Sequence, residues 1–352
     1  MAFAKGLNLT LILLICGIFT FGFLTIFVQN PKLATQQLIF FGLGILFFLA
    51  ISSLDIRIFK DFTIVFWFIS LVLVFFVTLA APEIRGSSRW VDLGFFRLQP
   101  TELAKPIVVL TLASFLEKAD QYSPKTLLKA AGLVFPFVFA AFWQPDLGNA
   151  IIFILIWYLA LFVSGYDLKI LASLGLLFLI LLPVWLLILA PYQRNRIETF
   201  LNPRTDPLGA GYSVIQSQIA VGSGQIFGRS LSGATQSKLE FLPEAPTDFI
   251  FASIAESYGF VGALIFICLF SILIYNLITR ALAFDRFSQI LFLLTAGLLS
   301  FQFLINLAMS VGLLPVVGVT LPLVSYGGSS LISSFILLSF VQSRLRFAPR
   351  TS

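Results

Sequence analysis

The chain begins with MAFAKGLNLTLILLICGIFTFGFLTIFV, residues 1–28, in which a single lysine precedes a long apolar run. The run extends for about twenty residues, enough to cross a hydrocarbon layer roughly 30 Å thick at 1.5 Å per residue. A secretory signal peptide would have a shorter apolar core that ends at a small-residue cleavage site, and no such site follows. This stretch therefore predicts a retained first membrane span.

The same pattern recurs along the whole chain. Of its 352 residues, 59% are hydrophobic and 11% are charged, and its mean hydropathy of +1.01 lies outside the range of soluble globular domains. Because long apolar runs satisfy their backbone hydrogen bonds as helices, we predict an all-α polytopic integral membrane protein with about ten transmembrane helices in a single domain, 1–352. The predicted spans are about 8–28, 36–54, 62–81, 101–117, 126–143, 147–164, 168–190, 249–278, 287–311 and 320–342, with a large extracytoplasmic loop at 191–247.

Residue types that the sequence lacks exclude several kinds of site. The chain has no histidine, which removes Ser-His-Asp and Cys-His nucleophilic arrangements and histidine metal sites. Its two cysteines, Cys16 and Cys268, lie inside apolar runs and form no CxxC pair, so we interpret them as packing residues. The net charge of +6 includes no long basic tail, which gives nucleic-acid binding little support. Acid and base chemistry must therefore depend on carboxylates, Lys or Tyr.

Basic residues in the short loops predict the orientation in the membrane. Placing Lys5 in the cytoplasm places most other short-loop basic residues there too, and leaves only Lys32 on the opposite side. Both termini are then cytoplasmic, and the loop at 83–100 and the insert at 192–247 face outward. Within the insert, apolar residues of 212–219 recur at helical spacing and predict a short amphipathic helix on the membrane surface. The basic residues of the outer segments are Arg85, Arg89, Arg97, Arg194, Arg196, Arg204, Arg229 and Lys238.

Asp248 follows FLPEAPT, residues 241–247, and precedes an apolar helix. One interpretation is structural: the side chain caps that helix by accepting hydrogen bonds from its first free amides. The other is functional, because the carboxylate faces a loop that carries Arg and Lys. Glu256 follows one or two turns deeper. Since an ionisable side chain within a span costs about 2.5 kcal/mol or more, Glu256 needs a partner or a watery cavity.

Three further polar features interrupt apolar runs. Glu102 and Lys105 lie three residues apart on one helix face, either as a functional pair or as an ion pair that only joins two helices. Asp146, in a QPD turn, caps the following helix on the structural interpretation. SYGGSS, residues 325–330, lies near two prolines in an apolar run, and such glycine-rich breaks are tolerated where a helix lines a cavity or packs closely.

The outer basic residues favour an anionic ligand when they are taken together. Any single arginine is most simply a solvated surface residue, but guanidinium groups bind phosphate oxygens in a bidentate manner. A cluster of them at the lipid surface suits a lipid with a diphosphate headgroup.

Several long motifs, in order, resemble the SEDS family of cell shape, elongation, division and sporulation proteins, most closely its RodA-like members. The chain departs from the common family pattern where Pro246 replaces a frequent His and Ser257 replaces a frequent Glu. The resemblance covers most of the chain, and its strongest pieces are RWVDLGFFRLQPTELAK (89–105), QPDLGNA (144–150), YQRNRIETFLNPRTDPLGAGYSVIQSQIAVGSG (192–224), FLPEAPTDFIFA (241–252) and GLLPVVGVTLPLVSYGGSS (312–330).

The resemblance implies a peptidoglycan glycosyltransferase that polymerises lipid II, an undecaprenyl-diphosphate-linked disaccharide-pentapeptide, at the outer face of the cytoplasmic membrane. It implies Asp248 as the catalytic carboxylate, a class B penicillin-binding protein as partner, and a role in the elongation machinery. We expect no fixed metal ligands, although a divalent cation, Mg or Mn, is one source of positive charge for the departing diphosphate. The residues expected to bind substrate are Arg89, Glu102, Lys105, Asp146, Arg194, Arg196, Lys238, Glu244 and Ser325.

Other functions stay open from the sequence. A lipid II flippase or transporter would use charges within spans, among them Glu102, Lys105 and Asp146, as a proton or headgroup path. A scaffold would only recruit the penicillin-binding protein. Within the resemblance itself, an FtsW-like division polymerase is the alternative to a RodA-like elongation polymerase.

Overall fold

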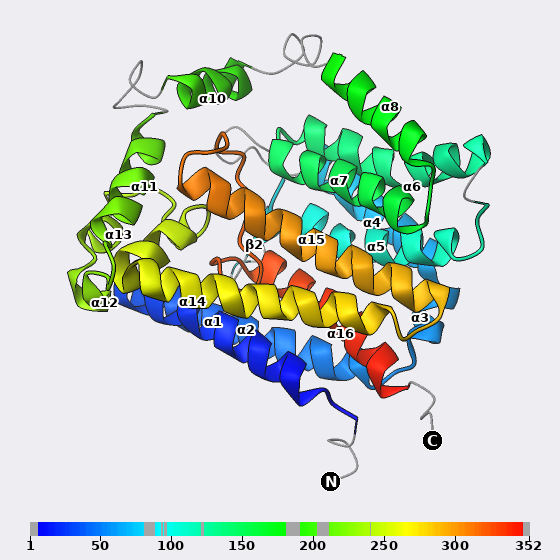
Figure 1. Cartoon of the computed structure of the whole chain (residues 1–352), viewed down its shortest axis with the longest axis horizontal. Helices are drawn as coiled ribbons and strands as arrows, with labels where there is room; N and C mark the ends of the chain where they lie inside the picture. The colour runs from blue at the N-terminus through cyan, green and yellow to red at the C-terminus, as the bar shows by residue number, and fades with distance from the viewer. Residues whose placement is uncertain are drawn as a thin grey trace.

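Long helices lie side by side in a bundle, as Figure 1 shows. This computed structural model describes residues 6–80, 89–92, 94, 97–120, 123–180, 191–202, 211–239 and 241–347. Arg85, Arg204 and the second half of the predicted seventh span, 181–190, lie outside the described residues. The helices are α1 (Leu9–Gln29), α2 (Pro31–Ser52), α3 (Ile56–Asp61), α4 (Thr63–Ala80), α5 (Pro100–Leu116), α6 (Pro124–Trp143), α7 (Leu147–Val163), α8 (Leu168–Ile180), α10 (Pro191–Leu201), α11 (Tyr212–Ser223), α12 (Ser230–Gly233), α13 (Thr235–Lys238), α14 (Ile250–Ala281), α15 (Arg286–Ser310) and α16 (Gly328–Arg346).

The predicted fold class is confirmed: the chain is an all-α, multi-pass membrane protein. Among the described residues, six helices are long and apolar enough to cross a membrane, namely α1, α2, α4, α6, α14 and α15, and α7 is a shorter apolar helix. Strands β1 (Val91–Asp92) and β2 (Arg97–Leu98) form one small antiparallel hairpin that pairs Val91 with Leu98. The predicted amphipathic helix of the insert corresponds to α11.

The first two helices are separated by a single residue. Asn30 closes α1 by donating its amide to the carbonyl of Ile26, and its side chain accepts hydrogen bonds from the amides of Lys32 and Leu33. Pro31 then occupies the first position of α2, where its missing N–H costs nothing. The second span therefore begins at Pro31 and not near residue 36, because a strong cap signal outweighs the polar residues that follow it.

The last predicted span, 320–342, is wrong at its start. Helix α16 begins at Gly328, and the preceding residues, 311–327, form a non-helical segment. Pro322 lacks the amide that a continuous helix would need, and Gly312 and Gly318 adopt positive φ angles of 79° and 72° that favour glycine. Residues 321–325 of this segment are buried, so their apolar composition reflects burial in the bundle and not helix formation.

Helix α14 is interrupted near its start by Gly259, whose backbone is non-helical with a φ of 69°. The break frees backbone amides that a neighbouring loop satisfies. The amide of Phe260 donates to the carbonyl of Gln225 at 2.8 Å. The amide of Val261 donates to the carbonyl of Ile226 at 3.0 Å. The loop between α11 and α12 therefore pairs with the broken helix, as membrane-embedded backbone must.

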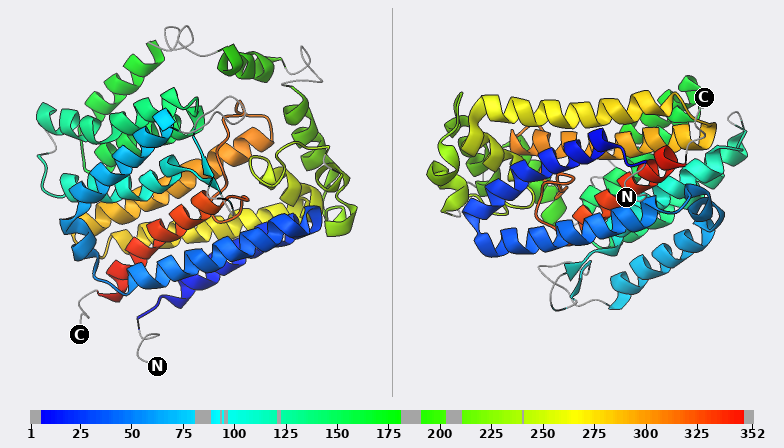
Figure 2. Two further views of the ribbon diagram at one scale, coloured as in Figure 1. Left: turned by 180° about the vertical axis from the view of Figure 1, so that it is seen from behind. Right: turned by 90° about the horizontal axis from the view of Figure 1, so that it is seen from below.

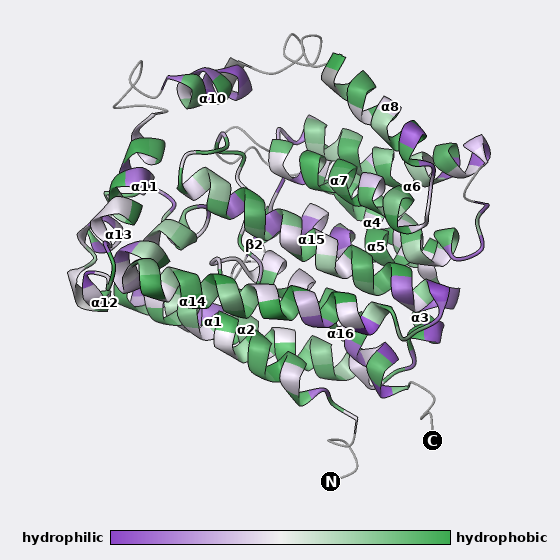
Figure 3. Cartoon of the chain, viewed as in Figure 1, coloured by the Kyte–Doolittle hydropathy of each residue, from purple (hydrophilic) through white to green (hydrophobic). Residues whose placement is uncertain are grey.

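One hydrophobic core joins the long helices, and a smaller one supports the loop before α14. In the large core α2 packs on α16 and α1 packs on α14, and the two views of Figure 2 show these neighbours. Figure 3 shows apolar residues along α1 and α14 and polar residues gathered at α3 and α10. The small core contains Ala220, Leu242, Ala245, Phe249 and Ala252. It supports the loop that carries Asp248.

Candidate active site

Asp248 lies in a tight turn that leads into α14. The carbonyl oxygen of Glu244 accepts hydrogen bonds from three successive amides at 3.1 to 3.3 Å: those of Thr247, Asp248 and Phe249. Phe249 occupies the N-cap position of α14 and makes no side-chain cap. The prediction that Asp248 caps this helix is therefore wrong, because the helix begins one residue later than such a cap requires.

The backbone next to Asp248 is held by the non-helical segment that precedes α16. The Ser325 hydroxyl donates to the carbonyl of Thr247 at 2.6 Å, and the amide of Tyr326 donates to the carbonyl of Pro246 at 2.7 Å. Ser325 is buried and its hydroxyl also accepts a hydrogen bond within its own turn. The structure gives Ser325 a role in positioning the loop, and its predicted contact with substrate stays a prediction.

Two more contacts place Asp248 without engaging its carboxylate. The side-chain amide of Asn306, on α15, donates to the backbone carbonyl of Asp248 at 2.9 Å. Gly318 packs next to the carboxylate, since a Cβ built on it would lie 3.6 Å from Oδ2 of Asp248. Gly148, at the start of α7, approaches the same segment, and a Cβ there would lie 2.6 Å from the carbonyl oxygen of Val317. Close backbone packing thus forms one wall of the site.

The environment of Asp248 raises the pKa of its carboxyl group from its ordinary 3.8 to about 6. Burial is the largest cause, because it disfavours the ionised form, and the negative charge of Glu244 adds to the effect. The positive charges of Arg196 and Arg89 act in the opposite direction, and the charge of Asp146 raises the pKa slightly further. Five predicted residues from four separate segments therefore share one electrostatic environment.

Asp146 caps α7, as predicted, and also orients its neighbours. Its Oδ1 accepts the amide of Asn149 at 3.2 Å, and its Oδ2 accepts the side-chain amides of Gln99 at 2.7 Å and Asn149 at 2.9 Å. Arg89 lies 3.6 Å from Oδ1 through its Nη1, with its side chain 30% exposed. Asp146 is buried and its oxygens are occupied by amides, and it also pairs with the Arg89 guanidinium at the rim of the site.

Arg196 is the second guanidinium that acts on Asp248. It lies on α10, is half-buried, and donates from Nη1 to the carbonyl oxygen of Val316 at 2.9 Å. This contact fastens α10 to the segment that holds Asp248. Arg194 and Lys238 are exposed on α10 and α13 and do not appear among the charges that shift the pKa of Asp248. Their predicted role in binding substrate stays a prediction.

Glu102 and Lys105 form a buried ion pair that lies apart from these charges. The Lys105 Nζ is 2.6 Å from Glu102 Oε1, and both side chains are almost fully buried. The hydroxyl of Ser333, on α16, donates to the Glu102 carbonyl at 2.7 Å. Both partners belong to α5, so the ion pair lies within one helix and does not join two, and the contact with α16 is made by the backbone of Glu102. The pair's predicted contact with substrate stays a prediction.

Glu256 has the partner that a buried carboxylate needs. Its oxygens accept the amides of Gln236 at 2.8 Å and Ser237 at 3.0 Å and the hydroxyl of Ser237 at 2.6 Å. The hydroxyl of Ser253, on α14, lies 3.0 Å from the hydroxyl of Ser237, within hydrogen-bond distance. Glu256 is fully buried, so it joins α13 to α14.

Sequence reasoning missed three amides that organise the site. Gln37 donates to the carbonyl of Ser325 at 3.0 Å, Gln99 holds Asp146, and Asn306 holds Asp248. All three are buried. Each lies in or at the end of an apolar run, and an amide inside a span needs an internal partner. That signal was available, but only the fold identifies the partner.

The described part of the chain brings together no group of three side chains of the kinds that hold a metal ion. Two carboxylates, Asp248 and Glu244, act on each other, but the oxygens of the third, Asp146, are already occupied by amides. These residues do not fit a protein-held divalent cation.

Comparisons with known proteins agree on one family. The sequence profile described as Cell cycle protein, FTSW_RODA_SPOVE, matches residues 2–348. The chain is similar to the peptidoglycan glycosyltransferase MrdB of Escherichia coli (strain K12), with 39% identity over 302 residues, 83% of this chain and 80% of the relative. Among solved structures it is similar to a chain of a complex described as "Structural coordination of polymerization and crosslinking by a peptidoglycan synthase complex", with TM-score 0.83, 31% identity, and coverage of 98% and 100%. The crystal structure of the Thermus thermophilus rod shape determining protein RodA has TM-score 0.74 and 30% identity, with coverage of 98% and 99%.

Proposed function

Because this chain belongs to the FTSW_RODA_SPOVE family, we propose that it is a peptidoglycan glycosyltransferase whose catalytic carboxylate is Asp248. The observation that carries the assignment of Asp248 is the contrast between its backbone, which is held by several hydrogen bonds, and its carboxylate, which accepts none from the residues that the structure describes. Its pKa of about 6 lies close to physiological pH, where a group best serves as a general base. Perturbed carboxyl groups of this kind cluster at catalytic sites.

The substrate is lipid II, which presents two sugar units on an undecaprenyl-diphosphate anchor. Asp248 accepts the proton of the acceptor's 4-hydroxyl as that oxygen forms a bond to the anomeric carbon of the donor sugar. The bond from that carbon to the diphosphate oxygen breaks, and the diphosphate leaves with its electron pair. One such displacement converts the α-linked donor into a β-1,4-linked product. General-base assistance contributes roughly 10²- to 10⁴-fold to the rate.

The departing diphosphate gains negative charge, and the guanidinium groups of Arg89 and Arg196 neutralise it. The positive charges of both groups lower the pKa of Asp248. Arg89 is held by its ion pair with Asp146, and Arg196 is held by its hydrogen bond to the carbonyl of Val316. Guanidinium groups bind phosphate oxygens through two parallel hydrogen bonds, which also orients the leaving group. Since the described residues do not form a cation cage, Mg or Mn enters this proposal only as a companion of the substrate's own diphosphate.

The site faces the outside of the cell, and both termini are cytoplasmic. The positive-inside rule supports this orientation, because basic residues crowd the end of the bundle where α14, α15 and α16 meet the short loops. Arg344 pairs there with Asp285 at 2.5 Å. Asp248 lies at the opposite end of α14 from Arg280. An outward site matches a substrate whose sugars are polymerised outside the membrane.

A class B penicillin-binding protein is the proposed partner, and elongation of a rod-shaped cell is the proposed role. The first rests on similarity to a chain of a peptidoglycan synthase complex that coordinates polymerisation and crosslinking. The second rests on the similarity to MrdB and to a rod shape determining protein. A division role of the FtsW kind is the alternative within the same family.

A second candidate function is favoured by the buried ion pair of Glu102 and Lys105. Charged pairs inside spans are typical of transporters, so the pair is the strongest argument for a flippase. Proteoliposomes separate the two functions. Headgroup translocation without polymer supports transport, whereas polymer formed from lipid II on the accessible face supports the enzyme.

The decisive experiment is polymerisation of lipid II by the purified full-length protein, with and without its partner. Asp248→Asn is expected to abolish polymer formation. The matched control is Asp92→Asn, which neutralises a half-exposed carboxylate on the β1–β2 hairpin and is expected to retain activity. Polymerisation by folded Asp248→Asn at the wild-type rate would overturn the assignment of the base.

A further inference from the structure

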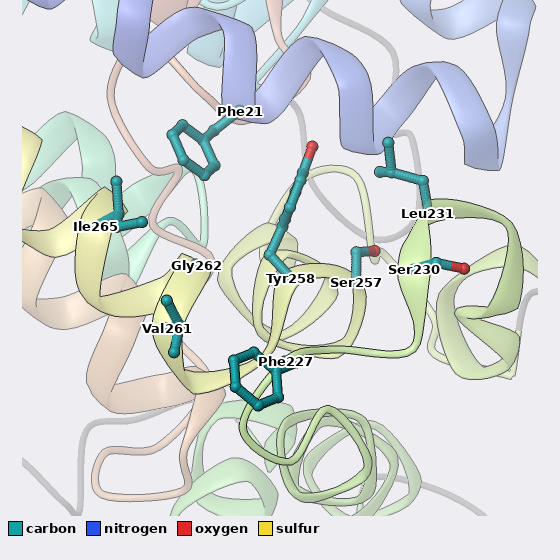
Figure 4. Close-up of a pocket in the computed structure, with 9 residues that line it drawn as sticks. All are labelled: Phe21, Phe227, Ser230, Leu231, Ser257, Tyr258, Val261, Gly262 and Ile265. Carbon is teal, nitrogen blue, oxygen red and sulfur yellow. The ribbon is translucent and has the colours of Figure 1, made fainter.

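A groove separate from the Asp248 site opens between α1, α14 and the loop that leads into α12. Its volume is about 490 Å³, within the roughly 300–1,000 Å³ of ligand sites. Figure 4 shows the rings of Phe21, Tyr258 and Phe227 around it, with Leu231 and Ile265 at its ends. The ring centroids of Phe21 and Tyr258 are 5.3 Å apart in an edge-on contact. Apolar side chains thus form most of the lining.

The break in α14 creates this groove. Gly259 interrupts the helix between the lining residues Tyr258 and Val261, and the loop that satisfies the freed amides brings Phe227 against the helix. Gly262 also lines the groove and packs against Tyr258, since a Cβ built on it would lie 2.2 Å from the Tyr258 Cβ. The groove is therefore a consequence of the paired loop and broken helix, and not a chance gap between straight helices.

The lining is continuous with the lipid-facing surface of the bundle. Phe227 is 82% exposed, and on α14 Phe260 is 65% and Ile265 is 50% exposed. In water such exposure of large apolar side chains would be unfavourable, but these residues border helices that cross the membrane. What covers them is hydrocarbon.

Arg229 lies in the chain between the lining residues Phe227 and Ser230, beside one end of the groove. The lining residues of α14 run from Ser257 inward to Ile265, so Glu256 marks the outer end. The amide of Arg229 donates to the carbonyl of Glu256 at 3.0 Å, and its exposed side chain donates from Nε to the carbonyl of Ser223. An exposed guanidinium at the outer end of an apolar groove is complementary to a lipid phosphate.

From this arrangement we infer that the groove binds one anionic phospholipid of the outer leaflet, with an acyl chain between Phe21 and Phe227 and the headgroup phosphate at Arg229. The bound chain fills the space that the break in α14 leaves open. The lipid therefore belongs to the surface where the outer loop meets the membrane, and it takes no part in the chemistry at Asp248.

Photocrosslinking tests the site on the full-length protein. The probe is phosphatidylglycerol with a diazirine in its acyl chain, diluted into phosphatidylcholine vesicles, and adducts are mapped by mass spectrometry. Adducts are expected to concentrate in residues 226–231 and 257–265. Unlabelled phosphatidylglycerol is expected to suppress them, and added phosphatidylcholine is not.

The chain offers a matched pair of variants for the groove. Ile265→Trp places bulk inside it, whereas Ile272→Trp places the same bulk two turns along α14, where the isoleucine is 49% exposed and does not line the groove. Adduct yield is expected to fall about tenfold for Ile265→Trp, a loss of about 1.4 kcal/mol of binding, and to stay unchanged for Ile272→Trp. Equal melting temperatures of the two variants show that the loss is local.

Arg229→Gln is expected to remove the advantage of phosphatidylglycerol over phosphatidylcholine, with Arg57→Gln, at the exposed Arg57, as its control. Four results would overturn the inference: adducts spread evenly over the lipid-facing helices, equal yields from the two tryptophan variants, an unchanged headgroup preference in Arg229→Gln, or adducts blocked by the penicillin-binding protein. Stronger competition by a polyprenyl diphosphate than by phosphatidylglycerol would also overturn it, because the groove would then belong to the substrate. None of these readouts depends on polymerisation.

Discussion

Two carboxylates lie eight residues apart at the outer end of α14 and have opposite surroundings. Glu256 is fully buried and accepts three hydrogen bonds from α13. Asp248 is partly exposed, and within the described part of the chain its carboxylate accepts no hydrogen bond, although its backbone is held from several sides. The difference shows that the position of an acid near the start of α14 does not by itself identify it as structural or catalytic. The donors around the carboxylate decide whether it holds the fold or stays available to a proton.

The largest expected effect separates the two carboxylates by activity. Asp248→Asn keeps the shape of the side chain but cannot accept the acceptor's proton, so the rate of lipid II polymerisation is expected to fall by roughly 10²- to 10⁴-fold. Glu256→Gln is expected to retain most of its activity per folded molecule. Equal losses in the two variants would contradict the separation.

For thermal stability, in contrast to activity, the larger loss is expected from replacing Glu256 and not Asp248. Glu256→Ala leaves two amides and a hydroxyl of α13 without their acceptor, and each unsatisfied buried group costs about 1–3 kcal/mol. Thermal unfolding in detergent is expected to show a clear drop in melting temperature. Ser237→Ala removes a single donor and serves as the graded control, with a loss of about 1 kcal/mol. A melting temperature equal to wild type in Glu256→Ala would show that the contact does not hold α13.

The close packing of Gly148 against the segment beside Asp248 is expected to affect the rate of polymerisation. Gly148→Ala places a Cβ about 2.6 Å from the Val317 carbonyl and pushes the segment that contains Gly318. Polymerisation is expected to slow by about tenfold or more, because small displacements of a catalytic group have large effects on rate. Gly132→Ala, on α6, meets nothing within 4 Å and is the control. Normal activity in Gly148→Ala would show that the segment tolerates displacement.

The pH dependence of activity tests whether Asp248 acts as the base. Asp248 must be ionised to act as a base, so the rate is expected to rise with pH up to about 6 and then to level off. Glu244→Gln removes a negative charge that raises the pKa and is expected to move this limb to lower pH. Arg196→Gln removes a positive charge and is expected to move it to higher pH. If both variants moved the pH limb in the same direction, the assignment of Asp248 as the titrating base would be contradicted.

The smallest expected effect is on stability at neutral pH. A pKa raised from 3.8 to about 6 means that the folded protein holds the proton more tightly than the unfolded chain. Protonation of Asp248 therefore stabilises the folded protein fully below pH 3.8, and this stabilisation is lost as the pH rises through about 6. Asp248→Asn is therefore expected to be more stable than wild type at pH 7, by about 1 kcal/mol after allowance for partial exposure. A lower melting temperature would contradict this prediction.

Much of the fold was predictable because membrane spans depend on composition. An apolar run longer than the hydrocarbon layer has to form a helix, so the positions of α1, α4 and α6 follow from the sequence. The cap at Asp146 and the ion pair of Glu102 and Lys105 were predictable too, because both arise from residues close together in the chain. The identification of Asp248 came from the resemblance, and the helix cap that local reasoning offered for it is absent.

The order of residues is enough to predict the membrane setting, the absence of histidine chemistry, and the set of carboxylates and guanidinium groups available. Which of these groups come into contact depends on the folded chain. Asp248, Arg89, Asp146 and Arg196 come from segments far apart in the chain, and the non-helical segment 311–327 contacts both the Asp248 loop and Arg196. The physical reason is that span formation depends on the solvent around each run, whereas the pKa and orientation of Asp248 depend on neighbours that only the folded chain supplies.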